Sequence, residues 1–251
     1  MSRASTKSQL NSGVVEIFDH DVRVDVAQIR PDSSWSLLIN TLSPGNHNFT
    51  AKTPNGQVIS KPWDINAVAP LSIGANHSMA ISNYYIVRGK PPEPGPAKAQ
   101  YQRIATGGVP PYTYSSSNLE VAKVGEFGMV SAAGNGSAVI EVRDSVNNVA
   151  RYTISFSGIQ QVALGAPVSW GQSESDRPWV AASLSLQEMQ LFYISYSPYT
   201  DDITAFLGWS DPDYWTSTNI AGLQTAYAYR LNFAFAYSAH GGTVLRSLLR
   251  A

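Results

Sequence analysis

The chain has 251 residues, of which 43% are hydrophobic and 14% charged, with a formal net charge of −1 and no cysteine. This length suits one to three domains. The lack of cysteine excludes a disulfide framework, and the near-zero charge gives no reason to expect nucleic acid as a partner. Abundant glycine, proline and tyrosine with few charges are typical of turn-rich extracellular β modules, and disulfide-free modules are common in bacterial surface proteins.

The start of the chain, residues 1–13, is polar and lacks the apolar core of a signal peptide, and no run reaches the ~18 apolar residues of a membrane span. The chain is therefore cytosolic, exported by another route, or one piece of a longer exported protein. We favour the last alternative, because the first predicted domain lacks its leading strand. The protein then lies at the bacterial cell surface or outside the cell, and this segment inserts into no membrane.

Short strands separated by turns fill the first part, which we place at residues 1–67. VVEIFD predicts a strand, SWSLLI predicts a second with Trp35 and Leu37 on one face, and NHNFTAK predicts a third. The pair Asn55-Gly56 is a strong hairpin signal. This spacing predicts an antiparallel β-sandwich.

The same stretch resembles the Ig-like repeats of large bacterial surface adhesins. Trp35 and residues 45–51 fall on the pattern of that family, whereas the leading strand and its Gly-rich turn are missing or disguised. The resemblance implies an Ig-like domain that is incomplete at its N-terminus.

The second part, residues 68–158, shows clean strand alternation at residues 138–142 and 152–156. The stretch KPPEPGPAKA, residues 90–99, holds four prolines, which exclude a helix or a strand interior. Because strand-like sequence lies on both sides, this stretch predicts an exposed loop inside one domain.

The glycines and tyrosines of this part follow the pattern of a second family. The order ATGG, PPYTYSSSN, VAKV and GNGSA resembles the bacterial Ig-like domains of the invasin and intimin type. The positions on that pattern are Gly107, Gly108, Tyr112, Tyr114, Val130, Gly134 and Gly136. The resemblance covers roughly a third of the chain and implies a second sandwich.

The third part, residues 159–251, contains the one strong helix signal. In SLSLQEMQLFYISYS, Ser185 and Glu188 have the spacing of a capping box, an apolar stripe follows at helical spacing, and Pro198 ends the helix. Further on, AYAYRLNFAFAY places its aromatic residues on one face of a long strand, or of two strands bent at the middle. TVLRSLLRA predicts the last strand.

The segments LSLQEMQLFY, LGW and YWTST, followed by strands, resemble the C-type-lectin-like domain. The likeness is to the cysteine-poor bacterial form that caps adhesins of the invasin and intimin type, where Ig-like repeats precede it. The predicted fold class is therefore mainly β, with two Ig-like β-sandwiches followed by an α+β compact C-type-lectin-like domain.

The segment DYWTST allows a structural and a functional interpretation. We interpret Trp215 as a buried core residue, because a large aromatic contributes most to a small domain from its core. Tyr214 and the hydroxyl residues can reach the surface by alternation and form a functional rim.

Neither a metal, a cofactor nor an enzyme activity is expected. The calcium motifs of sugar-binding lectin-like domains are absent, and too few residues follow YWTST for the long calcium-binding loop and the remaining strands. Calcium needs six to eight oxygens at close range, and we interpret the four nearby carboxylates as parts of solvated turns. The four histidines are spread over all three parts, and no HExxH, GxSxG or P-loop motif occurs.

These features predict a cell-surface recognition module in which Ig-like spacers present a lectin-like tip. The partner is a receptor on a host or neighbouring cell, a protein rather than a glycan, bound without calcium. The predicted ligand-binding residues are Tyr199, Asp201, Asp202, Trp209, Asp211, Asp213, Asn219 and His240. Two alternatives stay open: a structural module of a phage tail or secretion apparatus, and a calcium-independent glycan-binding lectin.

Overall fold

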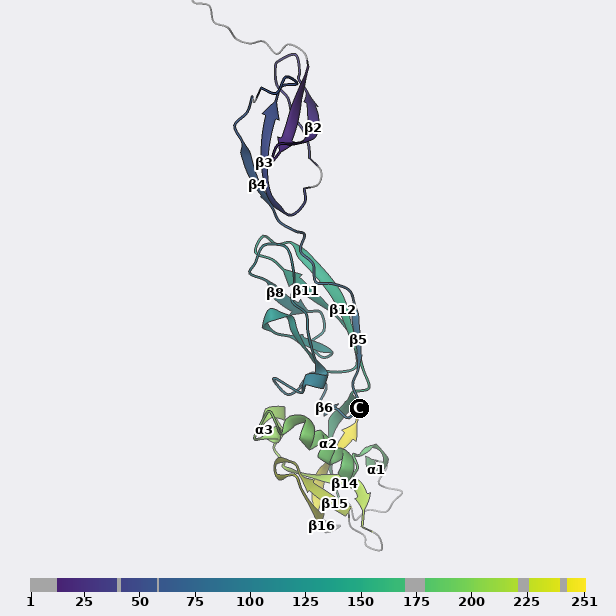
Figure 1. Ribbon diagram of the computed structural model, residues 1–251. Coiled ribbons are helices and arrows are strands. Elements are labelled where there is room, and N and C mark those ends of the chain that lie inside the picture. The colour runs from purple at the N-terminus through teal and green to yellow at the C-terminus, as the bar shows by residue number, and fades with distance from the viewer. Residues whose placement is uncertain (1–12, 40–41, 58, 170–178, 221–225, 240–242) are drawn as a thin grey trace, which may run out of the picture. The chain divides into compact units, whose positions relative to one another are not determined.

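The computed structural model describes residues 13–39, 42–57, 59–169, 179–220, 226–239 and 243–251 (Figure 1). The chain forms two compact units, residues 1–70 and 71–251. Strands dominate both units, so the fold is mainly β, as predicted.

The first unit contains one antiparallel sheet with the strand order β2-β1-β3-β4. The strands are β1 (Val14–Asp19), β2 (Val22–Gln28), β3 (Gly45–Lys52) and β4 (Trp63–Ala67). One face of β1 and β3 carries the buried core, formed by Val15, Ile17, Phe49 and Ala51. The predicted strands VVEIFD and NHNFTAK are confirmed, because side chains of alternating polarity let one sheet face be buried.

The predicted strand at SWSLLI is wrong, because residues 34–39 belong to no strand. Trp35 and Leu37 nevertheless pack against the core, whereas Leu38 is 80% exposed. The alternation therefore predicted the inner positions Trp35 and Leu37 correctly, but Ile39, which it places on the same face, is exposed. An extended segment can lay its apolar side chains over a sheet without joining it, since burial needs no inter-strand hydrogen bonds.

The second unit begins with a β-sandwich of two sheets, ordered β7-β10-β9 and β5-β12-β11-β8. The strands are β5 (His77–Ala80), β7 (Gln100–Gln102), β8 (Thr113–Ser116), β9 (Ala122–Val124), β10 (Met129–Ala132), β11 (Gly136–Arg143) and β12 (Val149–Ser157). Ile140 lies opposite Tyr152 in the register of β11 and β12, and both are buried. The two predicted alternating segments thus share one buried face.

The proline-rich segment 90–99 is a loop that ends in the short 3-10 helix η1 (Ala97–Ala99), as its prolines predict. Pro91 and Pro92 are buried rather than exposed. The Lys98 ammonium donates to the carbonyl oxygens of Ser82 (3.0 Å) and Asn83 (2.8 Å), which fixes the end of the loop.

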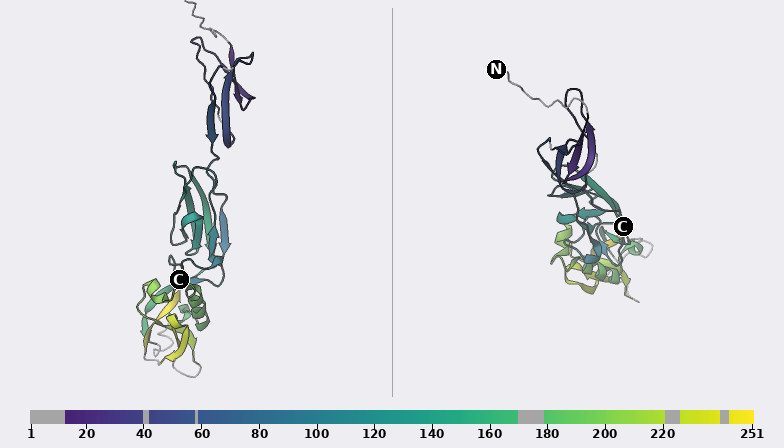
Figure 2. Two further views of the ribbon diagram at one scale, coloured as in Figure 1. Left: turned by 60° about the vertical axis from the view of Figure 1, so that its left-hand side comes forward. Right: turned by 45° about the horizontal axis from the view of Figure 1, so that its top comes forward.

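The C-terminal part of this unit is built on a six-stranded sheet with the order β16-β15-β14-β17-β13-β6. Its strands are β6 (Tyr85–Ile86), β13 (Gln160–Ser169), β14 (Asp213–Asn219), β15 (Ala226–Arg230), β16 (Phe235–Ala239) and β17 (Val244–Arg250). The helices are α1 (Trp179–Ala182), α2 (Leu186–Tyr196) and α3 (Ile203–Leu207), with the 3-10 turns η2 (Glu126–Gly128) in the sandwich and η4 (Leu231–Phe233) here. Helix α2 packs on one sheet face (Figure 1 and Figure 2).

The stretch AYAYRLNFAFAY is a hairpin, and the predicted single aromatic face is wrong. The chain reverses at η4, where Ala234 has a positive φ of 51°. In the hairpin register Tyr229 lies opposite Ala236, and Arg230 lies opposite Phe235. Cross-strand partners point to the same side of a sheet, so Phe235 shares a face with Arg230 and not with Tyr229.

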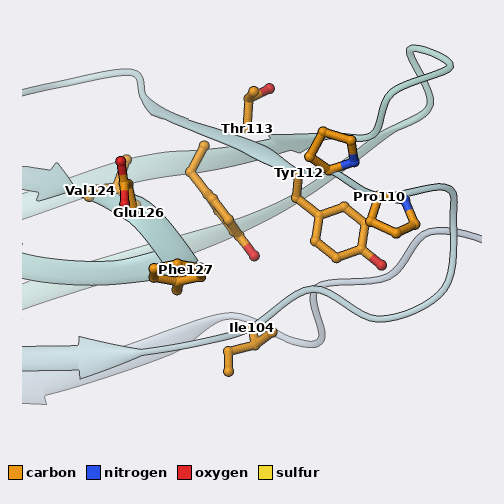
Figure 3. Close-up of a pocket in the computed structure, with 10 residues that line it drawn as sticks. Ile104, Pro110, Tyr112, Thr113, Val124, Glu126 and Phe127 are labelled. Atoms are coloured by element: carbon orange, nitrogen blue, oxygen red, sulfur yellow. The ribbon is translucent and has the colours of Figure 1, made fainter.

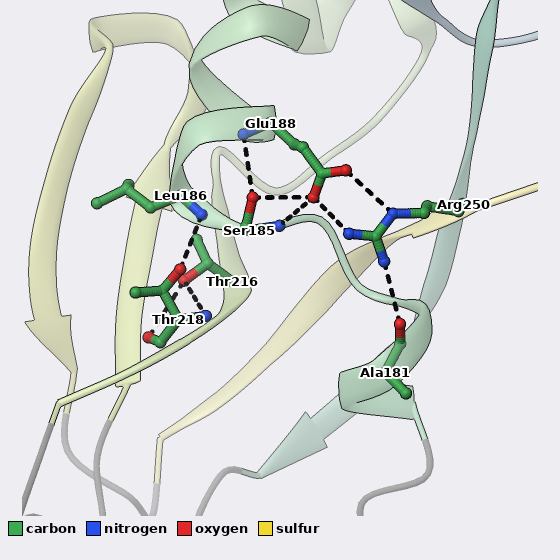
Figure 4. A network of polar contacts seen from close by, with 7 residues as sticks. All are labelled: Ala181, Ser185, Leu186, Glu188, Thr216, Thr218 and Arg250. Carbon is green, nitrogen blue, oxygen red and sulfur yellow. Dashed lines mark hydrogen bonds and ion pairs between the residues drawn. The ribbon is translucent and has the colours of Figure 1, made fainter.

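Helix α2 begins with the predicted capping box (Figure 4). The Ser185 hydroxyl accepts from the Glu188 N–H at 3.3 Å, and the Glu188 carboxylate accepts from the Ser185 N–H at 2.8 Å. The same carboxylate pairs with Arg250, the last residue of β17, whose guanidinium also donates to the Ala181 carbonyl at 3.0 Å. One glutamate thus ties the start of α2 to the last strand.

This network predicts a loss of stability in acid. Burial alone would raise the pKa of Glu188, but hydrogen bonds from Arg250 and Ser185 outweigh it and hold the pKa below its usual 4.5. A carboxyl whose pKa is lower in the folded protein than in the unfolded chain stabilises the fold at pH values above its unfolded-state pKa. This stabilisation is lost as the pH falls through its folded-state pKa. We expect Glu188→Gln, which keeps a capping-box residue, to lower the unfolding free energy by roughly 0.5–1 kcal/mol at neutral pH.

Urea unfolding of both chains at about pH 6 and about pH 3 checks this expectation. The difference between the two chains should shrink in acid. A constant difference across this range would contradict an ionised Glu188 as its source.

The sandwich and the six-stranded sheet share one hydrophobic core, and the chain passes between them at β6. Strand β6 lies among the sandwich residues in sequence but pairs in parallel with β13. The Tyr196 hydroxyl, at the end of α2, donates to the Lys90 carbonyl at 2.7 Å and accepts from the Val87 N–H at 3.0 Å. The predicted division at residue 158 stays a prediction, and any fragment meant to hold the complete sheet must include β6.

Candidate functional site

The turn η4 joins the two loops in which the sequence places most of the site. The Leu231 N–H donates to the Pro212 carbonyl at 2.8 Å, and the Asn232 amide donates to Asp202 Oδ1 at 2.9 Å. Loops 199–202 and 210–213 are thereby held beside the β15–β16 hairpin. The predicted residues in these loops are Tyr199, Asp201, Asp202, Asp211 and Asp213.

Asp202 serves the local fold. It is the N-cap of α3, and its Oδ1 accepts from the Ala205 N–H at 2.9 Å and from the Thr204 hydroxyl at 2.7 Å. These hydrogen bonds, the one from Ala205 first, lower the pKa of the carboxyl. Asp202 therefore fixes the position of the loop, whereas the neighbouring Asp201 is exposed.

Asp213 forms a bidentate ion pair with Arg230, with Nε–Oδ1 and Nη2–Oδ2 distances of 2.8 Å. The two residues are directly opposite in the register of β14 and β15. The Arg230 guanidinium also lies 6.0 Å from the ring centroid of Tyr237 on β16. Burial, followed by the Asp213 charge, raises the pKa of Tyr237, so its hydroxyl stays a neutral donor.

Two exposed phenylalanines flank this pair. Phe235 is 57% exposed and stacks on Tyr237, with ring centroids 6.1 Å apart, and Phe233 in the adjoining turn is 74% exposed. We call Asp213, Arg230, Phe235 and Tyr237 the hairpin patch. Such aromatic and arginine side chains are enriched in the binding hot spots of protein surfaces.

Three residues of the hairpin patch, Arg230, Phe235 and Tyr237, are not among the residues predicted from the sequence. The only signal in the sequence was that Arg230 interrupts an alternation of alanine and aromatic residues. Its meaning depended on the reversal at Ala234, because only the hairpin register places Arg230 beside both Asp213 and Phe235.

The other loop residues have mixed surroundings. Trp209 is half-buried and stacks on Phe192, with ring centroids 6.1 Å apart, so it contributes to the core under α2. Tyr199 is half-buried and follows α2 directly. Asp211 is exposed and lies 3.3 Å from Arg246 at a cavity of about 280 Å³, which Pro212 and Val244 also line.

One predicted residue lies away from this group, and another cannot be placed. Asn219 ends β14, six residues beyond Asp213, which places its backbone about 20 Å away at the opposite end of the strand. His240 lies outside the described residues.

The segment YWTST is core, as predicted for Trp215, which is fully buried. The predicted exposure of Tyr214 is wrong, since this ring is fully buried under α2. The hydroxyls of Thr216 and Thr218 bond to the Tyr227 carbonyl (2.8 Å) and the Leu186 N–H (3.0 Å). Both threonines therefore connect neighbouring elements, and Figure 4 shows the bond between Thr218 and Leu186.

Within the described ranges no group of three or more His, Cys, Asp or Glu residues has the arrangement of a metal site. Among the same residues no helix is long and apolar enough to cross a membrane. The expectation of calcium-independent binding stays a prediction.

Fold and site together define an Ig-like β-sandwich that continues into an α+β lectin-like part with an aromatic and charged surface patch. Residues 96–146 match the family model described as the intimin immunoglobulin-like domain. The chain is 27% identical over 201 residues to intimin of Citrobacter freundii, covering 76% of this chain and 21% of that protein. It thus spans about a fifth of the length of this curated relative.

A solved structure has the same fold as this chain. A crystal structure of the C-terminal 282-residue fragment of intimin, in complex with the translocated intimin receptor's intimin-binding domain, matches with a TM-score of 0.52 and 15% identity. The match covers 98% of this chain and 90% of that chain. Invasin, described as a bacterial integrin-binding protein, has a TM-score of 0.34 and 11% identity over 96% of this chain and 49% of its own. The resemblance to an invasin- and intimin-type adhesin is confirmed.

Proposed function

We propose that this chain is the receptor-binding end of a bacterial cell-surface adhesin. The Ig-like parts serve as spacers, and the lectin-like part binds a protein receptor of a host or neighbouring cell without calcium and without covalent chemistry. The match to the intimin fragment over nearly the whole chain supports this proposal, since that fragment was solved with its receptor domain bound.

The observation that carries the proposal is the hairpin patch. A monomeric soluble domain has little reason to hold Phe235 exposed beside a bidentate Arg230–Asp213 pair. Burial of the ring by a partner removes apolar surface from water, and the guanidinium can add hydrogen bonds to a partner carboxylate or carbonyl. Asp211, two residues before Asp213, extends this patch, and Tyr199 is included because the sequence predicts it.

The comparisons favour an adhesin over the two alternatives, the assembly module and the glycan-binding lectin. The patch also suits a protein surface better than a sugar. It offers stacked rings and one charge pair, in which both carboxylate oxygens of Asp213 are already occupied by Arg230.

Binding of the labelled full chain to cultured epithelial cells tests this function. We expect Phe235→Ala and Arg230→Ala each to weaken binding about thirtyfold or more, the size typical of a central hot-spot residue, and Tyr199→Ala and Asp211→Asn to weaken it less. Val146→Ala removes an equally exposed apolar side chain from the sandwich (58% exposed) and should bind like the parent chain.

A chelator should leave binding unchanged. Loss of binding on chelation would contradict calcium independence. Full binding by both Phe235→Ala and Arg230→Ala would remove the hairpin patch as the receptor site.

A further inference from the structure

The sandwich carries a second candidate site, an apolar groove of about 730 Å³ that lies outside the lectin-like part (Figure 3). Its walls come from the loop after β7, the start of β8 and the turn η2. The residues that matter most are Ile104, Pro111, Tyr112, Tyr114 and Phe127. Figure 3 shows Tyr112 and Phe127 on opposite sides of the groove, with Ile104 between them along one edge.

The two tyrosines offer their rings rather than their hydroxyls. The Tyr112 hydroxyl donates to the Gly107 carbonyl at 2.6 Å, and the Tyr114 hydroxyl accepts from the Ala105 N–H at 3.0 Å. These bonds fix the two rings in place and point each hydroxyl toward the backbone, which leaves each with only part of its hydrogen-bonding capacity for a polar ligand. The groove therefore suits a ligand that presents compact apolar rings.

Phe127 is held at the rim of the groove by its backbone. Its φ of 57° and ψ of 19° lie in the left-handed region, and its side chain is 71% exposed. The next residue, Gly128, also has a positive φ, and a Cβ there would lie 2.0 Å from the Arg103 carbonyl oxygen. No side chain fits at Gly128, so the turn that presents Phe127 to solvent is fixed by the surrounding fold.

One acidic group accompanies these rings. Glu126 lines the groove and is exposed. Across the part of the chain that the structure describes, its carboxylate has neither an ion pair nor a side-chain hydrogen bond. A free carboxylate beside an aromatic groove favours a cationic ligand over a neutral or acidic one.

We propose that this groove binds a proline-rich polypeptide segment that carries a basic residue. Pyrrolidine rings of an extended polyproline II segment dock between aromatic rings, and such a segment has no internal hydrogen bonds to lose. A lysine or arginine of the segment pairs with Glu126. A glycan would need several polar partners for its hydroxyls, and both tyrosine hydroxyls here are already bonded. This site is separate from the proposed receptor site and does not depend on it.

Fluorescence anisotropy of the full chain with a labelled Arg-(Pro)6-Arg peptide tests the proposal. We expect saturable binding that Phe127→Asn weakens at least tenfold. Asparagine tolerates a positive φ better than other non-glycine residues, so this variant removes the ring and keeps the turn. Glu126→Gln should weaken the arginine peptide about threefold and leave an uncharged polyproline peptide unaffected.

Leu119→Ala is the matched control, since Leu119 is 61% exposed on the same sandwich but does not line the groove. It should bind the peptide like the parent chain. Three results would overturn the proposal. They are a lack of saturable binding, unchanged binding by Phe127→Asn, and equal affinity for a Glu-(Pro)6-Glu peptide. Self-association of the chain that Phe127→Asn abolishes would identify a second copy as the occupant and overturn it as well.

Discussion

Replacement of Trp215 by alanine is expected to lower the unfolding free energy of residues 71–251 by about 3–5 kcal/mol, the range for truncating a buried Trp or Phe. The indole is fully buried and packs against Ala226 and Ala228 on the adjacent strand β15 and against Ala239 on β16, the strand beyond it. These alanines make room for it and cannot refill the space that it leaves. Its Nε1 also donates to the Val168 carbonyl at 3.0 Å, which would lose this donor.

Urea unfolding of the full chain, followed by circular dichroism, measures this loss. Phe233→Ala is the control, because Phe233 is 74% exposed in the same part of the fold and should change stability by less than about 0.5 kcal/mol. If Trp215→Ala were as stable as the parent chain, the segment YWTST would not be core. Its tryptophan would then become a candidate ligand residue again.

Sequence patterns correctly predicted the helix ends and strands that are determined by residues adjacent in sequence. The capping box at Ser185 and Glu188 and the stop at Pro198 lie within one helix, and the alternation along β3 buries Phe49 and Ala51 directly. In each case the residues that cause the structure are adjacent to the structure itself.

Sequence patterns failed where a structure depends on pairing with a segment that is distant in sequence. The alternation of residues 226–237 fits one strand or a hairpin equally well, and only the reversal at Ala234 separates them. SWSLLI alternates like a strand but finds no strand to pair with. The same limit applies to the candidate site. The loops at 199–202 and 210–213 could be proposed from their composition. Arg230 lies beside Asp213 only because β14 and β15 pair in one particular register, and no local pattern predicts that register.

Strand β6 is the clearest example of such a distant cause. Two residues, Tyr85 and Ile86, leave the sandwich and extend the lectin-like sheet. A two-residue strand has no periodicity to detect. Its position depends on hydrogen bonds from α2. The Ser195 hydroxyl accepts from the Tyr85 N–H at 3.2 Å, and the Tyr196 hydroxyl bonds to the backbone of Val87 and of Lys90.

The Tyr196 hydroxyl is therefore expected to hold the sandwich to the lectin-like part. Tyr196→Phe keeps the ring, which is fully buried, and removes only the oxygen. The Val87 N–H and the Lys90 carbonyl would each lose a partner, so we expect a loss of about 1–3 kcal/mol in unfolding free energy. Burial raises the pKa of this hydroxyl far above the ordinary range, so the effect should not depend on pH below about 9.

Hydrogen exchange of the Val87 amide in the full chain gives a local readout. In Tyr196→Phe this amide should exchange at least tenfold faster, whereas amides in the middle of β11 should change no more than the global loss of stability requires. Tyr193→Phe is the matched control, because Tyr193 lies on the same helix and is only half-buried. Unchanged exchange at Val87 would mean that β6 is held by its pairing with β13 and by Ser195, without a contribution from the Tyr196 hydroxyl. The sandwich and the lectin-like part would then be held together less strongly than the hydrogen bonds of Tyr196 indicate.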